Sequence, residues 1–323
     1  MDAGLQAAGF RLVWANDVDE DARRVYRLNL GAIDGRDIAA VPAVDVPDCD
    51  VIAAGFPCQP FSAAGRRRGV NDRRGNLYLD CLRIVEAKKP AVVLLENVKG
   101  ILAARAEDGR KIIDIIKEKL ETLGFLVSVR LLNAADYGVP QNRERVFIVA
   151  FRRAIGRAFE FPPAATKAKA TLRRALDIPS GTPNQAAFLP YPPQTQSMIE
   201  KIPSGGSWKS IPYSDLPPRF QRIRDDMRRY HSPNFYCRRR LDEPSGTITA
   251  SAQPEKCAIT HPTQNRRFTI REAARIQSFP DSFLFLDGTR RDIAAMYRLI
   301  GNAVPPRLAE TLGRAIQAQA FGG

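Results

Sequence analysis

Four side chains stand where reactive groups are expected, and the first is a cysteine. Cys58 follows the apolar run 50–54, which predicts a short buried strand that ends at Gly55 and Pro57. Reactive groups collect at the carboxyl ends of strands in open α/β sheets. An arbitrary cysteine is more often a buried structural side chain. Here, prolines flank the turn and an arginine-rich loop follows, and cations favour the thiolate. We therefore predict that Cys58 is a nucleophile.

A glutamate and two arginines are the other candidates. The run 90–95 is the most uniformly apolar stretch and predicts a central strand. Because Glu96 follows it directly, its carboxylate is expected at the same sheet edge as Cys58. The turn 137–145 carries Arg143 and Arg145, which share one face if the segment is extended.

The elements that must position these residues alternate between strand and helix as far as about residue 155. This alternation predicts an α/β fold with a doubly wound, mostly parallel sheet. Strands are expected over 10–15, 50–54, 90–95, 126–132 and 146–151, and helices over 2–9, 19–29, 77–87 and 107–123. From about 156 to 262 prolines cluster and periodicity fades, which predicts a smaller lobe of short strands and loops. Helices then return over 270–278 and 296–321, the latter interrupted at 301–306.

Composition narrows the class of protein. The 323 residues carry a net charge of +14, which favours a polyanionic partner, although a basic but otherwise ordinary enzyme is the alternative. Five cysteines form no metal-type pairs, so we expect reduced thiols and no metal. No apolar run approaches the roughly 20 residues of a membrane helix, and the N-terminus lacks a secretory signal. These features predict a cytoplasmic protein without a membrane partner.

Two acidic residues are candidates for binding a nucleotide. Asp17 follows the predicted strand 10–15, where a carboxylate can accept hydrogen bonds from a ribose. Asp37, with Ile38 beside it, is suited to an adenine amino group. Either residue alone is weak evidence, because acidic residues at strand ends are common.

Five sequence blocks carry a resemblance to a known family. In this order they resemble blocks of the DNA cytosine-5 methyltransferases, over nearly the whole chain except much of 156–240: Gly55-Phe56-Pro57-Cys58-Gln59-Pro60-Phe61-Ser62, Glu96-Asn97-Val98, Gln141-Asn142-Arg143-Glu144-Arg145, Arg271-Glu272-Ala273-Ala274-Arg275-Ile276-Gln277 and Gly301-Asn302-Ala303-Val304-Pro305.

The resemblance implies a reaction and a domain plan. Cys58 would add to C6 of a cytosine flipped out of double-stranded DNA. Glu96, its pKa raised by burial, would protonate N3, and Arg145 with Arg143 would stabilise negative charge. The methyl donor would be S-adenosylmethionine. The implied plan is a Rossmann-like catalytic domain over 1–178, a target-recognition domain over 179–262, and a hinge and C-terminal helix over 263–323.

The resemblance also implies contact residues. For the cofactor they are Asp17, Val18, Asp37, Ile38, Pro57, Leu77 and Asn302. For DNA, the resemblance together with side-chain chemistry suggests Ser62, Arg66, Arg67, Arg68, Arg73, Arg74, Gln141, Arg239, Arg240, Thr247 and Thr249.

One departure from the family leaves alternatives open. Family members open with a strand and a Phe-x-Gly-x-Gly loop, and the match here begins just after that loop, so we predict weak binding of S-adenosylmethionine. A DNA-binding remnant without catalysis and an RNA cytosine-5 methyltransferase are the alternatives. The RNA branch carries a Cys-Phe-Thr tripeptide that is absent here, which favours DNA. A cysteine hydrolase is disfavoured, because it needs a histidine within hydrogen-bond reach of Cys58. The chain has two histidines, His231 and His261, and both lie in or beside the smaller lobe of about 156–262, which we call the variable lobe. We expect a monomer that works at bacterial DNA.

Overall fold

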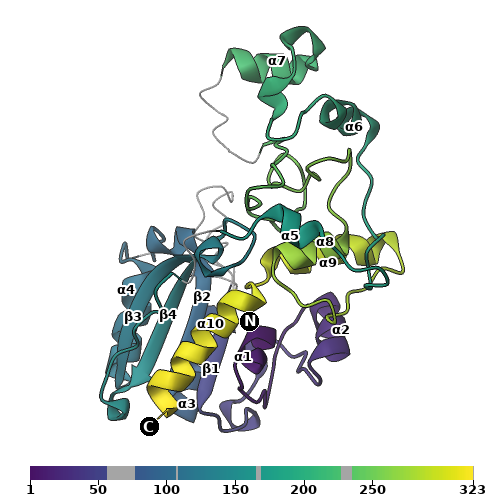
Figure 1. Cartoon of the computed structure of the whole chain (residues 1–323). Coiled ribbons are helices and arrows are strands. Elements are labelled where there is room, and N and C mark those ends of the chain that lie inside the picture. Colours follow the sequence, from purple (N-terminus) through teal and green to yellow (C-terminus); the bar gives the residue numbers. More distant parts are fainter. Residues whose placement is uncertain (57–76, 107, 165–168, 227–234, 323) are drawn as a thin grey trace. The chain divides into compact units, whose positions relative to one another are not determined.

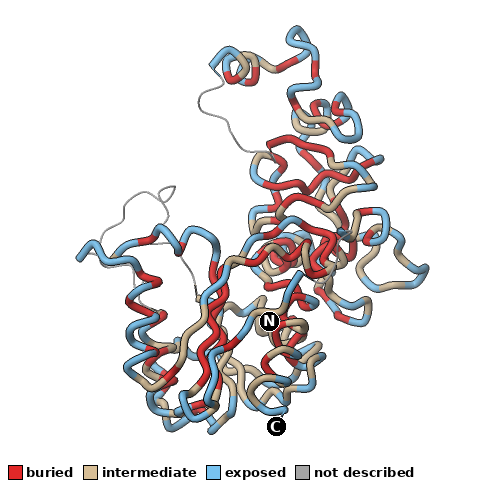
Figure 2. Tube along the Cα trace, turned by 60° about the vertical axis from the view of Figure 1, so that its left-hand side comes forward, coloured by how far each residue is buried: buried red, intermediate tan, exposed pale blue. Residues whose placement is uncertain are grey.

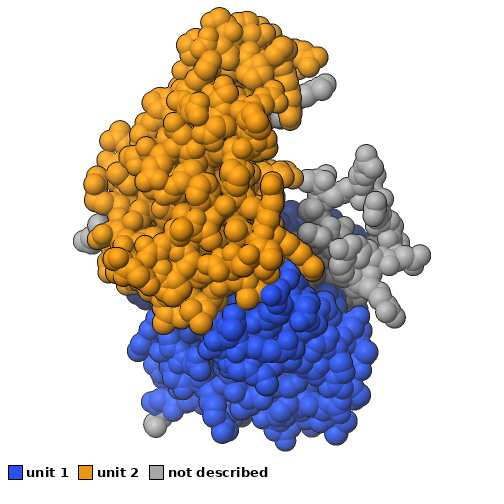
Figure 3. All heavy atoms as spheres, turned by 90° about the vertical axis from the view of Figure 1, so that its right-hand side faces the viewer, with its two compact units in different colours: residues 1–133, 144–165, 309–323 blue, residues 134–143, 166–308 orange. Residues whose placement is uncertain are grey.

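The computed structural model describes residues 1–56, 77–106, 108–164, 169–226 and 235–322 (Figure 1). The chain forms two compact units, coloured separately in Figure 3. Unit 1 comprises residues 1–133, 144–165 and 309–323, and unit 2 comprises 134–143 and 166–308. Contacts therefore group the segments 134–143 and 263–308 with the variable lobe. In the described part of the chain, no helix is both long and apolar enough to cross a bilayer.

Unit 1 is built on a four-stranded sheet with the order β1-β2-β4-β3. Its strands are β1 (Val51–Gly55), β2 (Val92–Val98), β3 (Phe125–Asn133) and β4 (Glu144–Arg152). β1 is parallel to β2, whereas β4 is antiparallel to both β2 and β3. The predicted α/β class is confirmed, but the prediction of a mostly parallel sheet is wrong for these strands. Apolar periodicity shows which residues are buried and does not show strand direction.

Two helices cover one face of this sheet. α3 (Leu77–Lys88) and α4 (Ile112–Thr122) share one hydrophobic cluster with the β2 residues Val93 and Leu95. Successive strand residues face opposite sides, so Glu96 belongs to the other face. Figure 1 shows α10 (Pro306–Ile316) running along that side, and Figure 2 shows the buried sheet residues. The helices predicted over 77–87 and 107–123 are thus found, the second beginning later than expected.

The N-terminal part of unit 1 departs from expectation. α1 (Asp2–Ala7) and α2 (Glu20–Asn29) are helices, and Asp19 caps α2 by accepting hydrogen bonds from two backbone amides of its first turn. The strand predicted over 10–15 is absent from the described structure, and the chain there makes one isolated bridge, from Asn16 to Asp34. An apolar run forms a strand only where a neighbouring strand supplies its ladder.

Unit 2 consists of short helices and loops. Its helices are α5 (Leu172–Leu176), α6 (Pro193–Glu200), α7 (Pro218–Asp225), α8 (Ile270–Ile276) and α9 (Arg290–Asn302). An aromatic core containing Trp208, Phe220, Phe235 and Tyr236 joins α6 and α7. In the described residues of unit 2 we find isolated bridges instead of the predicted short strands. The predicted interruption of the last helix is confirmed, since α9 ends at Asn302 and α10 begins at Pro306.

Candidate active site

Glu96 and Arg145 form a buried ion pair on neighbouring strands of unit 1. Arg145 Nε lies 3.0 Å from Glu96 Oε1, and their side chains are 13% and 11% exposed. Val98 is paired with Arg145 across β2 and β4. Since Glu96 and Val98 share one face of β2, Arg145 is a diagonal neighbour of Glu96 on that face. One of the two arginines of the segment 137–145, Arg145, therefore lies against Glu96.

Gly55 leaves space for the carboxylate. It is the β1 residue paired with Glu96, and a Cβ added to it would lie 3.3 Å from Glu96 Oε2. Burial lowers the pKa of the Arg145 guanidinium, and the Glu96 carboxylate opposes that effect. The pair thus places a carboxyl group and a cation side by side, and Glu96 lies beside the last residue of β1, the strand that leads to Cys58.

Several predicted residues lie outside the described part of the chain. The segment 57–76 contains the predicted nucleophile Cys58, the cofactor candidate Pro57, and the DNA candidates Ser62, Arg66, Arg67, Arg68, Arg73 and Arg74. Their roles remain predictions.

Arg143 and Gln141 are interior residues of unit 2. The Arg143 guanidinium donates to the carbonyls of Ile248 (2.9 Å), Gly301 (2.7 Å) and Ala303 (3.0 Å), and its side chain is fully buried. Arg143 is expected on the same face as Arg145 only if the segment is extended, and that condition is not met, because β4 begins at Glu144 and Arg143 precedes it. We therefore do not retain Arg143 as a catalytic residue.

Gln141 belongs to the same buried network and is not available to DNA. Its amide nitrogen donates to Gln277 Oε1 (3.0 Å), and its Oε1 accepts the Ile248 amide (3.1 Å). Gln277 in turn donates to the Ile300 carbonyl (2.6 Å). The described structure thus gives Gln141 a buried structural role and lends no support to the predicted DNA contact, and Gln277 is a structural residue that sequence reasoning left without a role. A polar residue in a turn reads as exposed, and sequence alone does not reveal its buried partners.

The remaining DNA candidates are partly engaged within unit 2. Arg240 is exposed, and its Nε lies 3.0 Å from Asp242 Oδ1. The hydroxyl of Thr247 donates to the Asn142 carbonyl (2.7 Å), and Thr249 shares a hydrogen bond with Ser251 (3.1 Å). Arg239 is half-buried.

Comparison with known proteins decides the family. The model of the C-5 cytosine-specific DNA methylases matches residues 1–318. The chain belongs to this family. It is 38% identical to the type II methyltransferase M.NgoFVII of Neisseria gonorrhoeae, over 98% of this chain and 83% of that protein. It is 35% identical to M.Eco47II of Escherichia coli, over 98% of this chain and 76% of that protein.

Solved structures show the same fold. A proposed DNA modification methyltransferase from an Escherichia coli prophage superposes with a TM-score of 0.69 at 22% identity, covering 99% of this chain and 96% of that one. The Schizosaccharomyces pombe Dnmt2 methyltransferase gives 0.65 at 19% identity, with the same coverage. The chain is accordingly a DNA (cytosine-5-)-methyltransferase, and family membership implies that it uses S-adenosylmethionine and acts on DNA.

The cofactor candidates of unit 1 lie on two neighbouring segments. Asn16 forms a bridge with Asp34, and its side chain donates to the Arg36 carbonyl (2.8 Å). Asp17 directly follows Asn16, and Asp37 directly follows Arg36, so the two aspartates are next to residues that are in contact. Asp17 accepts the Asp19 amide (2.8 Å), and Asp37 accepts the Ala39 amide (3.0 Å) at the start of a 3₁₀ turn. Asp37 therefore caps this turn and is not part of a strand in the described structure.

Arg23 holds these segments together, which sequence reasoning missed. Its Nη1 donates to the Asp17 (3.1 Å), Val18 (2.8 Å) and Gly35 (3.4 Å) carbonyls. A Cβ on Gly35 would lie 2.8 Å from the Arg23 guanidinium carbon, so a larger residue at this position would require the guanidinium to shift.

The other cofactor candidates differ in exposure. Val18 is 61% exposed and Ile38 is half-buried, so apolar surface stands beside the two carboxylates, as an adenosine group requires. Leu77 begins α3 and is half-buried. Asn302 ends α9 in unit 2 and is exposed. The described unit 1 residues fit the adenosine part of S-adenosylmethionine.

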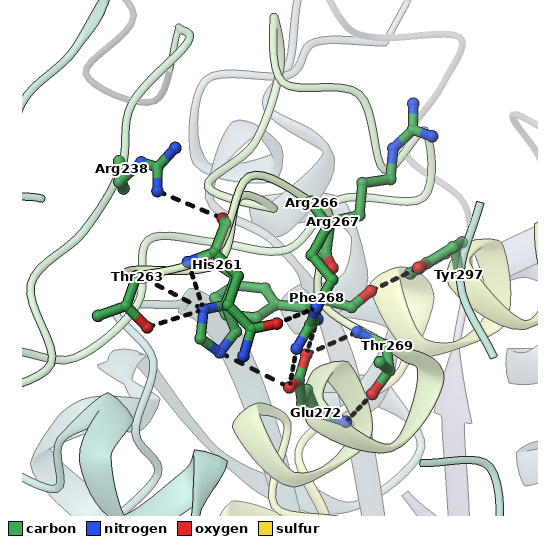
Figure 4. Close-up of polar contacts among 10 residues, drawn as sticks. Arg238, His261, Thr263, Arg266, Arg267, Phe268, Thr269, Glu272 and Tyr297 are labelled. Carbon is green, nitrogen blue, oxygen red and sulfur yellow. Dashed lines mark hydrogen bonds and ion pairs between the residues drawn. The ribbon is translucent and has the colours of Figure 1, made fainter. Parts of the chain in front are cut away.

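A second buried polar cluster lies in unit 2 (Figure 4). His261 Nδ1 accepts the backbone amides of Thr263 (3.2 Å) and Gln264 (3.1 Å). Its Nε2 faces Glu272 Oε1 at 3.7 Å, and Arg266 donates to both Glu272 oxygens (2.7 and 2.8 Å). Nδ1 can accept these hydrogen bonds only while it carries no proton, so the fold requires the neutral ring.

We expect His261 to make unit 2 sensitive to acid. Burial lowers the pKa of His261 from 6.5 to about 4; Arg266 and Arg238 act in the same direction, and Glu272 opposes them. Between these pH values the unfolded chain binds a proton that the folded chain does not. Stability is therefore full above pH 6.5 and is lost as the pH falls toward 4, by roughly 3 kcal/mol.

Urea unfolding at pH 7 and pH 4 tests this expectation. Carboxylates also titrate as the pH falls, but they affect all variants alike, so a difference between variants reports on the histidine that was changed. His261→Asn offers an oxygen acceptor that does not titrate, so it should lose much less stability on acidification than the native chain. His231→Asn, which changes the other histidine, is the matched control and should behave like the native chain. An equal acid response in all three proteins would contradict the role of His261.

Proposed function

We propose that this methyltransferase acts through a covalent adduct between the Cys58 sulfur and C6 of cytosine. The observation that carries this proposal is the buried pair of Glu96, on β2 beside β1, and Arg145, on the next strand β4. β1 ends at Gly55, three residues before Cys58. A thiolate, an acid and a cation are the three groups that the chemistry of cytosine demands, since C5 becomes nucleophilic only after addition at C6.

The roles follow from the groups that each atom of the base requires. The Cys58 thiolate adds to C6, and Glu96 donates a proton to N3 as the ring gains electron density. Arg145 stabilises the negative charge near O2. When bound, S-adenosylmethionine would supply the electrophilic methyl group, which C5 would take with S-adenosylhomocysteine as the leaving group. Loss of the C5 proton and cleavage of the sulfur–C6 bond regenerate the thiolate. The target base must leave the helix stack for any of these contacts to form.

We also propose a division of binding tasks. Asp17 and Asp37, with Val18 and Ile38, hold the adenosine part of the cofactor, and unit 2 carries the surface that contacts DNA. The basic charge of +14 supports a polyanionic substrate. Arg239, Arg240, Thr247 and Thr249 remain candidates for that contact.

A methyl-transfer assay tests the proposed function. Tritiated S-adenosylmethionine is offered with mixed-sequence duplex DNA and, in parallel, with tRNA. We expect label in DNA only, and bisulfite sequencing should locate it at C5 of cytosine in one sequence context. Label in tRNA alone would favour the RNA reaction. DNA binding without label in either substrate would favour a non-catalytic protein.

A further inference from the structure

Asn97 makes a contact that its place in the sheet does not require. It lies in β2 directly after Glu96 and is 3% exposed. Its Nδ2 donates to the Phe56 carbonyl at 2.9 Å, and its Oδ1 accepts the Val98 amide at 2.9 Å. Both ends of the carboxamide are therefore used, and the side chain is held in one orientation.

This hydrogen bond extends the pairing of β1 and β2 by one residue. The last paired residues of the two strands are Gly55 and Glu96, so Phe56 lies just beyond the ladder. The Phe56 ring packs against Tyr78 of α3, with ring centroids 6.3 Å apart. Phe56 is consequently fixed both by its carbonyl and by its ring where the chain leaves β1.

The anchored residue stands two positions before the proposed nucleophile. Cα atoms two residues apart are at most about 7 Å from each other in any conformation. Fixing Phe56 therefore fixes the point at which the chain leaves β1 toward Cys58, next to the place where Gly55 faces Glu96. A reacting group displaced by about 1 Å can cost on the order of 100-fold in rate.

We propose that Asn97 is a positioning residue for methyl transfer, because it holds the Phe56 carbonyl and so directs the chain that carries Cys58. The inference rests on the proposed role of Cys58. Asn97 does not touch the base, and its effect should appear in the rate of sulfur addition and not in DNA affinity.

Hydrogen exchange at C5 of cytosine isolates the addition step. When sulfur bonds to C6, C5 takes a proton from water; loss of tritium from C5 and cleavage of the sulfur–C6 bond restore cytosine. The assay therefore measures tritium released from mixed-sequence DNA labelled at cytosine C5, without S-adenosylmethionine. It is run across a range of pH, beside measurements of DNA affinity and melting temperature.

Two substitutions separate the donor from the rest of the side chain. Asn97→Asp keeps an oxygen for the Val98 amide but cannot donate to Phe56, and Asn97→Ala removes the carboxamide without adding charge. We expect both to release tritium 10- to 100-fold more slowly, with DNA affinity within about two-fold of the native chain. For Asn97→Ala the plateau of the pH profile should fall without moving along the pH axis.

Asn29→Asp is the matched control, since Asn29 of α2 also donates its amide to a backbone carbonyl, that of Val25 (2.8 Å). It should leave the exchange rate unchanged. Equal release by the native chain and by Asn97→Ala would overturn the inference and leave the proposed function standing. Absence of release by the native chain would overturn the proposed function, and this inference with it.

Discussion

Replacement of Glu96 by glutamine is expected to slow methyl transfer by about 10²- to 10⁴-fold, the usual contribution of a general acid. Glutamine matches the shape of glutamate and can still donate a hydrogen bond, but it has no acidic proton to give to N3. The Glu96 carboxylate is buried and lies 3.0 Å from Arg145 Nε, so few other groups can reach the same place. A single-turnover assay with saturating DNA measures the loss, and DNA affinity should change far less.

Glu144→Gln makes the same chemical change on the neighbouring strand. Glu144 begins β4, is half exposed, and pairs with Lys99 at 3.0 Å. A surface ion pair of this kind contributes about 1 kcal/mol or less, so this variant should keep a rate within about two-fold of the native chain. Comparable losses in the two variants, or a loss below ten-fold for Glu96→Gln, would show that Glu96 is not the proton donor.

The meeting of Glu96 with Arg145 could be predicted only in part, because Glu96 follows one apolar run and Arg145 precedes another, and these two ends share a sheet edge only when the strands are antiparallel. Runs of apolar residues locate strands, and strand ends collect at sheet edges. The antiparallel direction of β4 could not be predicted, because direction depends on pairing and leaves no trace in one strand's own pattern.

The misplacement of Arg143 has a similar origin. Residues i and i+2 share a face only within a strand, and residue 143 is not part of one, because β4 begins one residue later. Gln141 is polar and lies in a turn, which predicts an exposed side chain. Its partners, Gln277 and Ile248, are more than 100 residues away in the sequence, and nothing local identifies them.

Buried polar networks are thus the part of this protein that its sequence conceals most. Asn97 could have been singled out only as the residue beside the proposed proton donor Glu96, and Arg23 only as an arginine near Gly35. In both cases the partner is a backbone carbonyl, and every residue offers one. A side chain that donates to a backbone carbonyl could therefore pair with almost any segment, and the sequence does not show which one it meets.

The substitution Arg143→Met is expected to destabilise unit 2 by about 3 to 5 kcal/mol. Methionine matches the length of the side chain but leaves the carbonyls of Ile248, Gly301 and Ala303 without their guanidinium donors. Each buried acceptor left unsatisfied costs about 1–3 kcal/mol, and relief of the desolvated charge offsets part of the total. Urea unfolding followed by Trp208 fluorescence reports on unit 2, because Trp208 is 2% exposed in its core. A Trp14→Phe background removes the other tryptophan.

Two further variants decide whether geometry or charge matters at position 143. Arg291→Met removes an exposed arginine of α9 and should change stability by less than about 0.5 kcal/mol. Arg143→Lys keeps the charge but replaces the planar fork, which reaches three carbonyls, with a single ammonium. If the planar guanidinium is what joins the segments of Ile248, Gly301 and Ala303, lysine will restore only a minor part of the lost stability. Full recovery with lysine would mean that a buried cation suffices, and a loss below 1 kcal/mol in Arg143→Met would mean that the carbonyl contacts do not hold unit 2 together.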